Sequence, residues 1–208
     1  MKIVAIDREK QHLFKITLSN NSEFLLDADT VNDKALFCGM EISQDEIDAL
    51  KHDSDFKRAK SRAFLYLDKT DYSEKALFDK LKKAGFAQGI CAEVLAYLCE
   101  IGIVNDKRYA ERLSERLLEA NRSKREIINK LYLKGVPLTL AKEILSECEV
   151  DEESQIKALI ERKYAYKLQD KSNYNKVYAA LVRKGFSFSA IKSALKEYIK
   201  DIEFSEEY

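Results

Sequence analysis

The sequence predicts a mainly α-helical protein made of three tandem three-helix repeats in an elongated array, preceded by a small N-terminal module that contains β-strands. Helix start and stop signals recur three times at a spacing of 50 residues, which is typical of repeat architectures. The 208 residues include only 6 Gly and 1 Pro, and this scarcity suits long helices better than a sandwich or a barrel.

We expect the N-terminal module, residues 1–52, to form a small antiparallel sheet packed against short helices. Strands are predicted at residues 2–6, 12–18 and 23–26, with a turn at residues 20–22. A short helix is expected near residues 31–37, and Ser43 with Glu46 has the spacing of a capping box that opens another. A ribbon of two or three strands is marginal in water by itself, so these helices should cover it.

The first helix of each repeat is predicted from a charged amphipathic stretch that follows a helix-capping residue. These helices are expected at residues 56–68, 107–119 and 156–167. The candidate N-caps are Asp55 for the first helix, Asn105 and Asp106 for the second, and Ser154 for the third. The repeats themselves are expected to span residues 53–106, 107–150 and 151–202, followed by an acidic tail at residues 203–208.

The second and third helices of each repeat are predicted from residues that recur in one register. The N-caps of the middle helices are Ser73, Ser123 and Asn173, and the glycines expected to end those helices are Gly85, Gly135 and Gly185. A second set of N-caps is expected at Gly89, Thr139 and Ser189, and equivalent buried leucines at Leu81, Leu131 and Leu181. We also expect neighbouring repeats to share a continuous core, as in other repeat arrays.

The net charge of zero conceals a strong polarity along the chain. Residues 1–50 carry five basic and ten acidic side chains, whereas residues 156–200 carry eleven basic and three acidic ones, a net charge of +8. Such asymmetry suits a phosphate backbone or an acidic protein groove, although solvated helix faces also carry many lysines. The candidate binding residues are Arg122, Lys124, Arg125, Lys130, Lys134, Arg162, Lys163, Lys167, Lys171, Arg183 and Lys184.

Several function classes receive no support from the sequence. No apolar run is long enough for a membrane span and the N-terminus lacks a signal-peptide pattern, so we expect a cytoplasmic protein. The 4 cysteines form no C-x-x-C pair and the chain has only 2 histidines, so we expect no metal and no cofactor. Motifs for phosphate loops, metalloproteases and serine hydrolases are missing. We therefore expect no catalytic residues.

Several segments together resemble the RecX regulatory proteins of bacteria. They include Ala63–Leu67, Tyr72–Leu77 and Leu81–Phe86 in the first repeat, the Gly-Ile-Val-Asn-Asp-Lys-Arg-Tyr-Ala link at residues 102–110, and Leu131–Val136 in the second. The resemblance covers about residues 56–198, and the link is its most specific element. It implies three tandem three-helix repeats that lie in the groove of the RecA filament on single-stranded DNA and restrain ATP hydrolysis and strand exchange.

The resemblance therefore implies RecA as the partner. We also expect a monomer, with single- or double-stranded DNA as a second partner. Two alternatives remain open from the residues alone. One is a nucleic-acid-binding protein whose units act as helix-turn-helix modules, although residues 190–195 offer few polar side chains for reading bases. The other is a helical scaffold with an unrelated protein partner. Salt dependence separates phosphate-dominated binding from binding through protein contacts.

Overall fold

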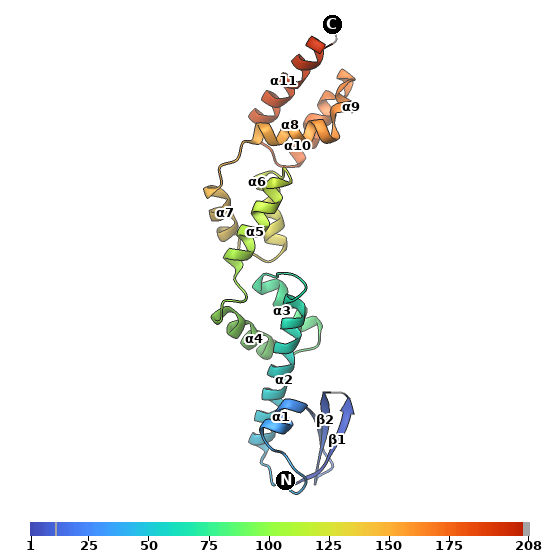
Figure 1. The fold of residues 1–208 in the computed structure, drawn as a ribbon, viewed down its shortest axis with the longest axis vertical. Helices are drawn as coiled ribbons and strands as arrows, with labels where there is room; N and C mark the ends of the chain where they lie inside the picture. The colour runs from blue at the N-terminus through green and yellow to red at the C-terminus, as the bar shows by residue number, and fades with distance from the viewer. Residues whose placement is uncertain (11, 206–208) are drawn as a thin grey trace. The chain divides into compact units, whose positions relative to one another are not determined.

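The computed structural model describes residues 1–10 and 12–205, and leaves out the side chains of residues 171 and 199–205. The chain divides into two compact units, Met1–Asn105 and Asp106–Tyr208. Figure 1 shows a small sheet near the N-terminus and helices in the rest of the described chain. The prediction of a mainly α-helical protein with a small strand-containing module is therefore confirmed.

The N-terminal sheet has three antiparallel strands in the order β1-β2-β3, as predicted. The strands are β1 (Ile3–Lys10), β2 (Leu13–Leu18) and β3 (Glu23–Asp27). Alternate residues such as Ile16 and Leu18 are buried, which gives the sheet one apolar face. That face packs with Ile47 and Leu50 of the following helix, α2 (Gln44–Leu67), so the sheet is covered as expected.

Helix α1 (Ala28–Asp33) begins and ends earlier than the predicted helix at residues 31–37. Asp27 is its N-cap and accepts a hydrogen bond from the backbone N–H of Thr30 at 3.1 Å. Ala35 has a φ of 47° and stops the helix. The helix begins earlier than predicted because Asp27 is both the last residue of β3 and the N-cap of α1, with no loop between them.

Helix α2 (Gln44–Leu67) is a single helix of 24 residues. The capping box that opens it is confirmed, since Glu46 N–H donates to Ser43 Oγ at 3.2 Å and Ser43 N–H donates to Glu46 Oε2 at 2.8 Å. The predicted new helix start at Asp55 is wrong. Asp55 lies inside α2 and pairs with Arg58 at 3.0 Å, and no Gly or Pro interrupts the stretch. The expected boundary after residue 52 therefore falls within a continuous helix.

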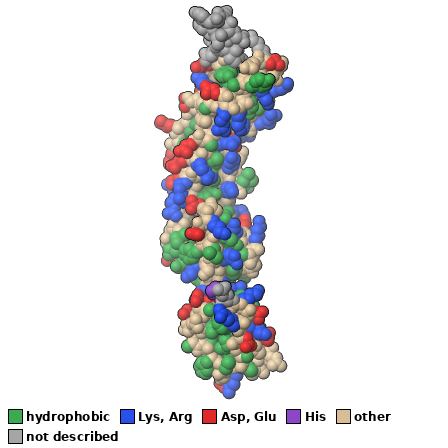
Figure 2. Space-filling view, turned by 45° about the vertical axis from the view of Figure 1, so that its right-hand side comes forward, with side chains coloured by type: hydrophobic (Ala, Val, Ile, Leu, Met, Phe, Trp, Pro, Cys, Tyr) green, Lys and Arg blue, Asp and Glu red, His purple; other side chains and the backbone are tan. Residues whose placement is uncertain are grey.

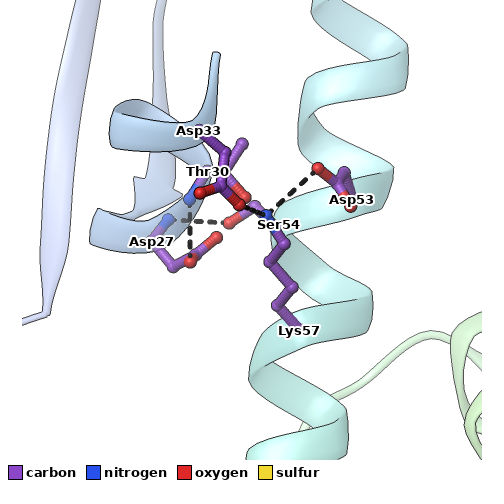
Figure 3. A network of polar contacts seen from close by, with 6 residues as sticks. All are labelled: Asp27, Thr30, Asp33, Asp53, Ser54 and Lys57. Atoms are coloured by element: carbon purple, nitrogen blue, oxygen red, sulfur yellow. Dashed lines mark hydrogen bonds and ion pairs between the residues drawn. The ribbon is translucent and has the colours of Figure 1, made fainter. Parts of the chain in front are cut away.

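Polar contacts join the sheet and α1 to the middle of α2 (Figure 3). The backbone N–H of Asp27 donates to the buried Ser54 Oγ at 2.8 Å. Lys57 Nζ lies 2.7 Å from Asp33 Oδ2 and 3.4 Å from Asp53 Oδ2. The hydrogen bond that Lys57 donates to Asp33 is the main reason that the pKa of Lys57 is raised. These contacts fix the N-terminal module to the helix that continues into the first repeat.

The fifty-residue register is reproduced by the helix bounds. The first helices of the repeats are the second half of α2, then α5 (Asp106–Glu119) and α8 (Glu152–Lys163). The middle helices are α3 (Glu74–Lys83), α6 (Lys124–Leu133) and α10 (Tyr174–Arg183). The last helices are α4 (Gln88–Glu100), α7 (Leu138–Glu147) and α11 (Phe188–Ser205).

Two short segments, α9 (Ala165–Leu168) and η1 (Lys171–Asn173), follow α8. Residues 203–205 of the expected acidic tail belong to α11, and residues 206–208 lie outside the described residues.

The predicted caps of the middle helices are partly confirmed. Ser73 and Ser123 accept hydrogen bonds from the third helical amide, at 3.2 Å and 3.1 Å. Asn173 makes no side-chain cap, because η1 precedes α10 and Asn173 Nδ2 donates instead to the carbonyl of Lys167 at 3.2 Å. The glycines that follow these helices are confirmed as left-handed residues, with Gly85 at φ +96° and Gly185 at φ +89°.

The caps predicted for the last helices are wrong, and so is the cap predicted for α8. Gly89, Thr139 and Ser189 are the second residues of the last helices, which begin at Gln88, Leu138 and Phe188. Their N-caps in the first two repeats are Ala87 and Pro137, neither of which makes a side-chain cap bond. In the third repeat the N-cap of α8 is Asp151, which accepts from the backbone N–H of Ser154 at 3.1 Å, so Ser154 lies in the first turn.

Each repeat closes its own hydrophobic core. Leu81, Leu131 and Leu181 are completely buried, as predicted. The buried residues form separate clusters in the N-terminal module and in the three repeats, so the prediction of a continuous core is wrong. Three short helices are enough to bury one core because the apolar side of each first helix packs against the other two helices of its repeat. In the second repeat, Ala110 of α5 shares a cluster with Leu131 of α6 and Ala141 of α7.

Candidate functional site

The candidate basic residues all lie in the unit Asp106–Tyr208, and the structure brings three of them together. Arg125 near the start of α6 meets Arg183 and Lys184 at the end of α10. They line an open groove of about 570 Å³, which we call the α6–α10 groove. Its remaining lining residues are Glu126, Asn129, Val182 and Gly185.

A second groove of about 730 Å³ adjoins the first and shares Arg125, Asn129, Val182 and Gly185 with it. We call it the α7–α11 groove. Its other lining residues are Lys124, Ile128, Leu138, Lys142, Glu152, Phe186, Ser187 and Phe188. The two grooves therefore combine cationic side chains with apolar ones. On the face shown in Figure 2, Lys and Arg side chains on this unit are interspersed with hydrophobic ones.

The walls of the α6–α10 groove are held together where two helix ends meet. Ser123, the N-cap of α6, donates its hydroxyl hydrogen to the carbonyl of Lys184, which closes α10, at 2.5 Å. The carbonyl would otherwise be one of the unpaired acceptors at a helix C-terminus. Gly185 packs so closely on Arg125 that a Cβ atom there would lie 2.8 Å from Arg125 Cβ. This contact places the basic side chains of the second and third repeats beside one another.

Three other candidates are engaged inside the protein. Arg122 and Lys130 both pair with Glu126, at 3.0 Å and 3.3 Å. Lys124 lines the α7–α11 groove and donates to the carbonyl of Cys148. These contacts give all three cations a structural role, while Arg125 and Arg183 have no ion pair or hydrogen bond to an acidic side chain among the described residues.

The structure does not bring the remaining candidates to either groove. Arg162 and Lys163 are exposed at the C-terminal end of α8, Lys167 is exposed in α9, and Lys134 is exposed just after α6. The side chain of Lys171 lies outside the described residues. Sequence reasoning missed Lys142 because it lies outside the basic clusters, and Asn129 because it is uncharged. The helical spacing of Asn129 from Arg125 was the available signal for that residue.

The first unit has an open groove of about 510 Å³ next to α2. Lys57 and Arg58 line it, but both pair with carboxylates of α1 or α2, as described above. Arg62 and His12 also line it, together with the carboxylates Asp27 and Asp29. Because acids and bases are mixed there, this groove has less excess positive charge than those near α6.

The structure assembles little that resembles catalytic or metal chemistry. No group of three or more His, Cys, Asp or Glu side chains placed for a metal ion occurs among residues 1–10 and 12–205. Burial raises the pKa of the Cys91 thiol and so favours the less nucleophilic protonated form. His52 Nε2 lies 2.9 Å from Glu93 Oε2, and both side chains are exposed on the surface. No helix in the described part of the chain has the length and apolar character that a bilayer crossing requires.

The fold defines a helical-repeat protein of tandem three-helix domains with an N-terminal sheet. Two family models match it: the first three-helix domain of RecX over residues 59–98, and the third three-helix domain of RecX over residues 151–195. The curated proteins that are similar to it carry the name "Regulatory protein RecX". The chain is therefore similar to RecX proteins, in its first and third three-helix domains and over most of its length.

Relatives from two streptococci illustrate the extent of the similarity. The protein of Streptococcus sanguinis is 28% identical over 196 residues, which cover 93% of this chain and 76% of the relative. The protein of Streptococcus gordonii is 28% identical over 209 residues, which cover 100% of this chain and 80% of the relative.

Two solved structures have the same fold. A crystal structure of regulatory protein RecX aligns with a TM-score of 0.69 and 20% identity, covering 93% of this chain and 98% of the other. A crystal structure of RecX from Lactobacillus salivarius aligns with a TM-score of 0.62 and 23% identity, covering 69% and 96%.

Proposed function

We propose that this protein is a non-catalytic regulator that binds RecA filaments on single-stranded DNA and lowers their ATP turnover and strand exchange. It acts as a cytoplasmic monomer without a cofactor, in recombination, DNA repair and the SOS response. Similarity to proteins named as regulatory proteins supports the regulatory role. The partner and the direction of regulation are those that the resemblance implies.

The observation that carries the proposal is the convergence of Arg125, Arg183 and Lys184 in the α6–α10 groove. Guanidinium groups recognise carboxylates and phosphates with paired hydrogen bonds. Arg125 and Arg183 are exposed and have no acidic partner among the described residues, so their donors remain available. The Ser123–Lys184 hydrogen bond holds the groove in shape before binding, which reduces the entropy lost on association.

A regulator of this kind needs no chemistry of its own. A protein that contacts more than one subunit of a polymer gains affinity from effective concentration. If it binds one filament state more tightly than another, it shifts the filament toward that state and can slow nucleotide turnover. The tandem three-helix domains supply the repeated surfaces that such contacts require.

The test is the ATPase activity of RecA on single-stranded DNA with this protein titrated in. We expect the wild-type protein to lower turnover, and the Arg125→Glu/Arg183→Glu variant to require at least about ten times more protein for the same effect. The matched control is Lys75→Glu/Lys83→Glu, which places the same charge change at the same repeat positions of the first unit. An unchanged ATPase rate with saturating wild-type protein would refute the proposal.

A second candidate function is direct binding of nucleic acid, favoured by the excess of eleven basic over three acidic residues in 156–200. Binding to phosphates should weaken by orders of magnitude between low and moderate salt, because counterions are released from the nucleic acid. Binding through filament protein contacts should weaken less. Titrations of bare single-stranded DNA and of RecA filaments across the same salt range therefore separate the two functions.

A further inference from the structure

Helix α6 carries an exposed apolar pair beside the basic grooves. Leu133 is 82% exposed and Tyr132 is 63% exposed. The equivalent positions of the first repeat hold Lys82 and Lys83, which are also exposed. The repeat fold therefore has no need for apolar side chains at these two positions, and their exposure to water calls for another explanation.

The apolar pair continues a stripe along one face of α6. Residues three or four apart lie side by side on a helix. Leu133 is therefore adjacent to Asn129, and Asn129 to Arg125, while Tyr132 is adjacent to Ile128. Arg125, Ile128 and Asn129 all line the α7–α11 groove. We call these five residues the α6 stripe.

The grooves at the start of the stripe have excess positive charge. Five basic side chains line them, Lys124, Arg125, Lys142, Arg183 and Lys184, against two acidic ones. Both acids already have donors within the protein. Glu126 pairs with Arg122 and Lys130, and Glu152 accepts hydrogen bonds from the hydroxyl and backbone N–H of Ser187 at 2.6 Å and 3.1 Å.

Apolar side chains also accompany the cations within the grooves. Leu138 and Phe188 line the α7–α11 groove and are exposed. A nucleic acid would use the cations and could stack a base on Tyr132, but it offers little to Leu133 or Leu138. A protein segment with acidic residues beside large apolar ones complements both features. Aromatic and apolar side chains next to arginine are typical of the residues that contribute most to protein interfaces.

We propose that the α6 stripe and the two grooves dock an acidic segment of the filament protein, with Tyr132 and Leu133 as its apolar anchors. This inference rests on the proposed function, since the segment belongs to the partner named there. The acidic side chains of the segment pair with Arg125 and Arg183, and its apolar side chains cover Leu133 and Tyr132.

The test compares Tyr132→Ala/Leu133→Ala with the wild-type protein in binding to RecA filaments and to bare single-stranded DNA. Both positions are exposed, so the variant should keep the wild-type circular dichroism and melting temperature. We expect filament affinity to fall by about 10- to 100-fold and affinity for bare DNA to stay unchanged. The matched control is Tyr166→Ala, because Tyr166 is 85% exposed in the same unit but lines neither groove.

A photo-crosslinking amino acid at position 132 provides a second readout, and we expect it to label the filament protein rather than the DNA. If wild-type protein and the double variant bind filaments equally, the docking proposal is overturned while the proposed function stands. Equal losses of affinity for filaments and for bare DNA, or labelling of DNA, would show a nucleic-acid surface and also overturn it. If the wild-type protein fails to bind filaments, both the proposed function and the docking proposal fail.

Discussion

Replacing Gly185 by Ala should loosen the junction between the second and third repeats. Gly185 has a φ of +89°, and a Cβ atom there would lie 2.8 Å from Arg125 Cβ and 3.0 Å from Ser123 Oγ. Left-handed backbone costs a non-glycine residue about 1–2 kcal/mol. Overpacking against a side chain near the backbone adds about 1–3 kcal/mol.

Gly85 provides a matched control for this substitution. It follows α3 at the same repeat position with a φ of +96°, and nothing lies within 4 Å of an added Cβ atom. Gly85→Ala should therefore show only the backbone cost of about 1–2 kcal/mol, whereas Gly185→Ala should cost about 2–5 kcal/mol. The difference between the two variants measures the contact between the repeats.

Hydrogen exchange measured by mass spectrometry is the suitable assay, because it reports local stability separately for each unit. In Gly185→Ala we expect faster exchange in peptides from α6 and α10, and in Gly85→Ala only in peptides around α3 and α4. Equal free-energy losses in the two variants would refute the reasoning, since the junction would then contribute no packing constraint.

Three further predictions concern stability and protonation. Leu131→Ala should lower the free energy of unfolding by about 2–5 kcal/mol because Leu131 is completely buried, whereas Leu133→Ala should change it little. Urea denaturation of both variants measures the two losses, and similar losses would contradict the assigned burial. Ser123→Ala should cost about 1–3 kcal/mol by thermal unfolding, since it removes both the cap of α6 and the bond to Lys184, and a cost near zero would contradict both contacts. The hydroxyl of Ser154, and then its backbone N–H, lowers the pKa of Asp151 below its ordinary 3.8, so the cap stabilises α8 above that pH and the stabilisation is lost as the pH falls through the lowered pKa. In Ser154→Ala the pKa of Asp151 from an NMR titration should rise, and an unshifted value would rule out this cause.

The fold was largely predictable because its signals are local. Ser73, Ser123 and the three glycines mark helix ends through their own side chains or backbone freedom, so their spacing predicts the repeat. The N-caps predicted for the last helices lie two residues too late in the first two repeats, because the starts of α4 and α7 carry no polar capping side chain. The methyl side chain of Ala87 cannot accept a hydrogen bond from a helix amide, so the sequence pattern favours Gly89 instead.

The candidate site was predictable only in part. Composition identified the basic residues of the second and third repeats, but their convergence depends on a contact between Ser123 and Lys184, which are 61 residues apart. No local pattern encodes that contact. In the sequence, Tyr132 and Leu133 differ from the lysines at the equivalent positions of the first repeat, Lys82 and Lys83. Periodicity alone does not show whether such an apolar residue is exposed or in the core.

The continuity of α2 has a consequence for how insertions and deletions can change the protein. An α-helix turns by about 100° and rises about 1.5 Å for each residue. One residue inserted between Lys57 and Ala63 would rotate the whole N-terminal sheet by about 100° around α2, relative to the first repeat. An insertion of seven residues would nearly restore the original orientation and shift the sheet by about 10 Å. Related proteins with an altered α2 should therefore differ by lengths close to whole helical turns.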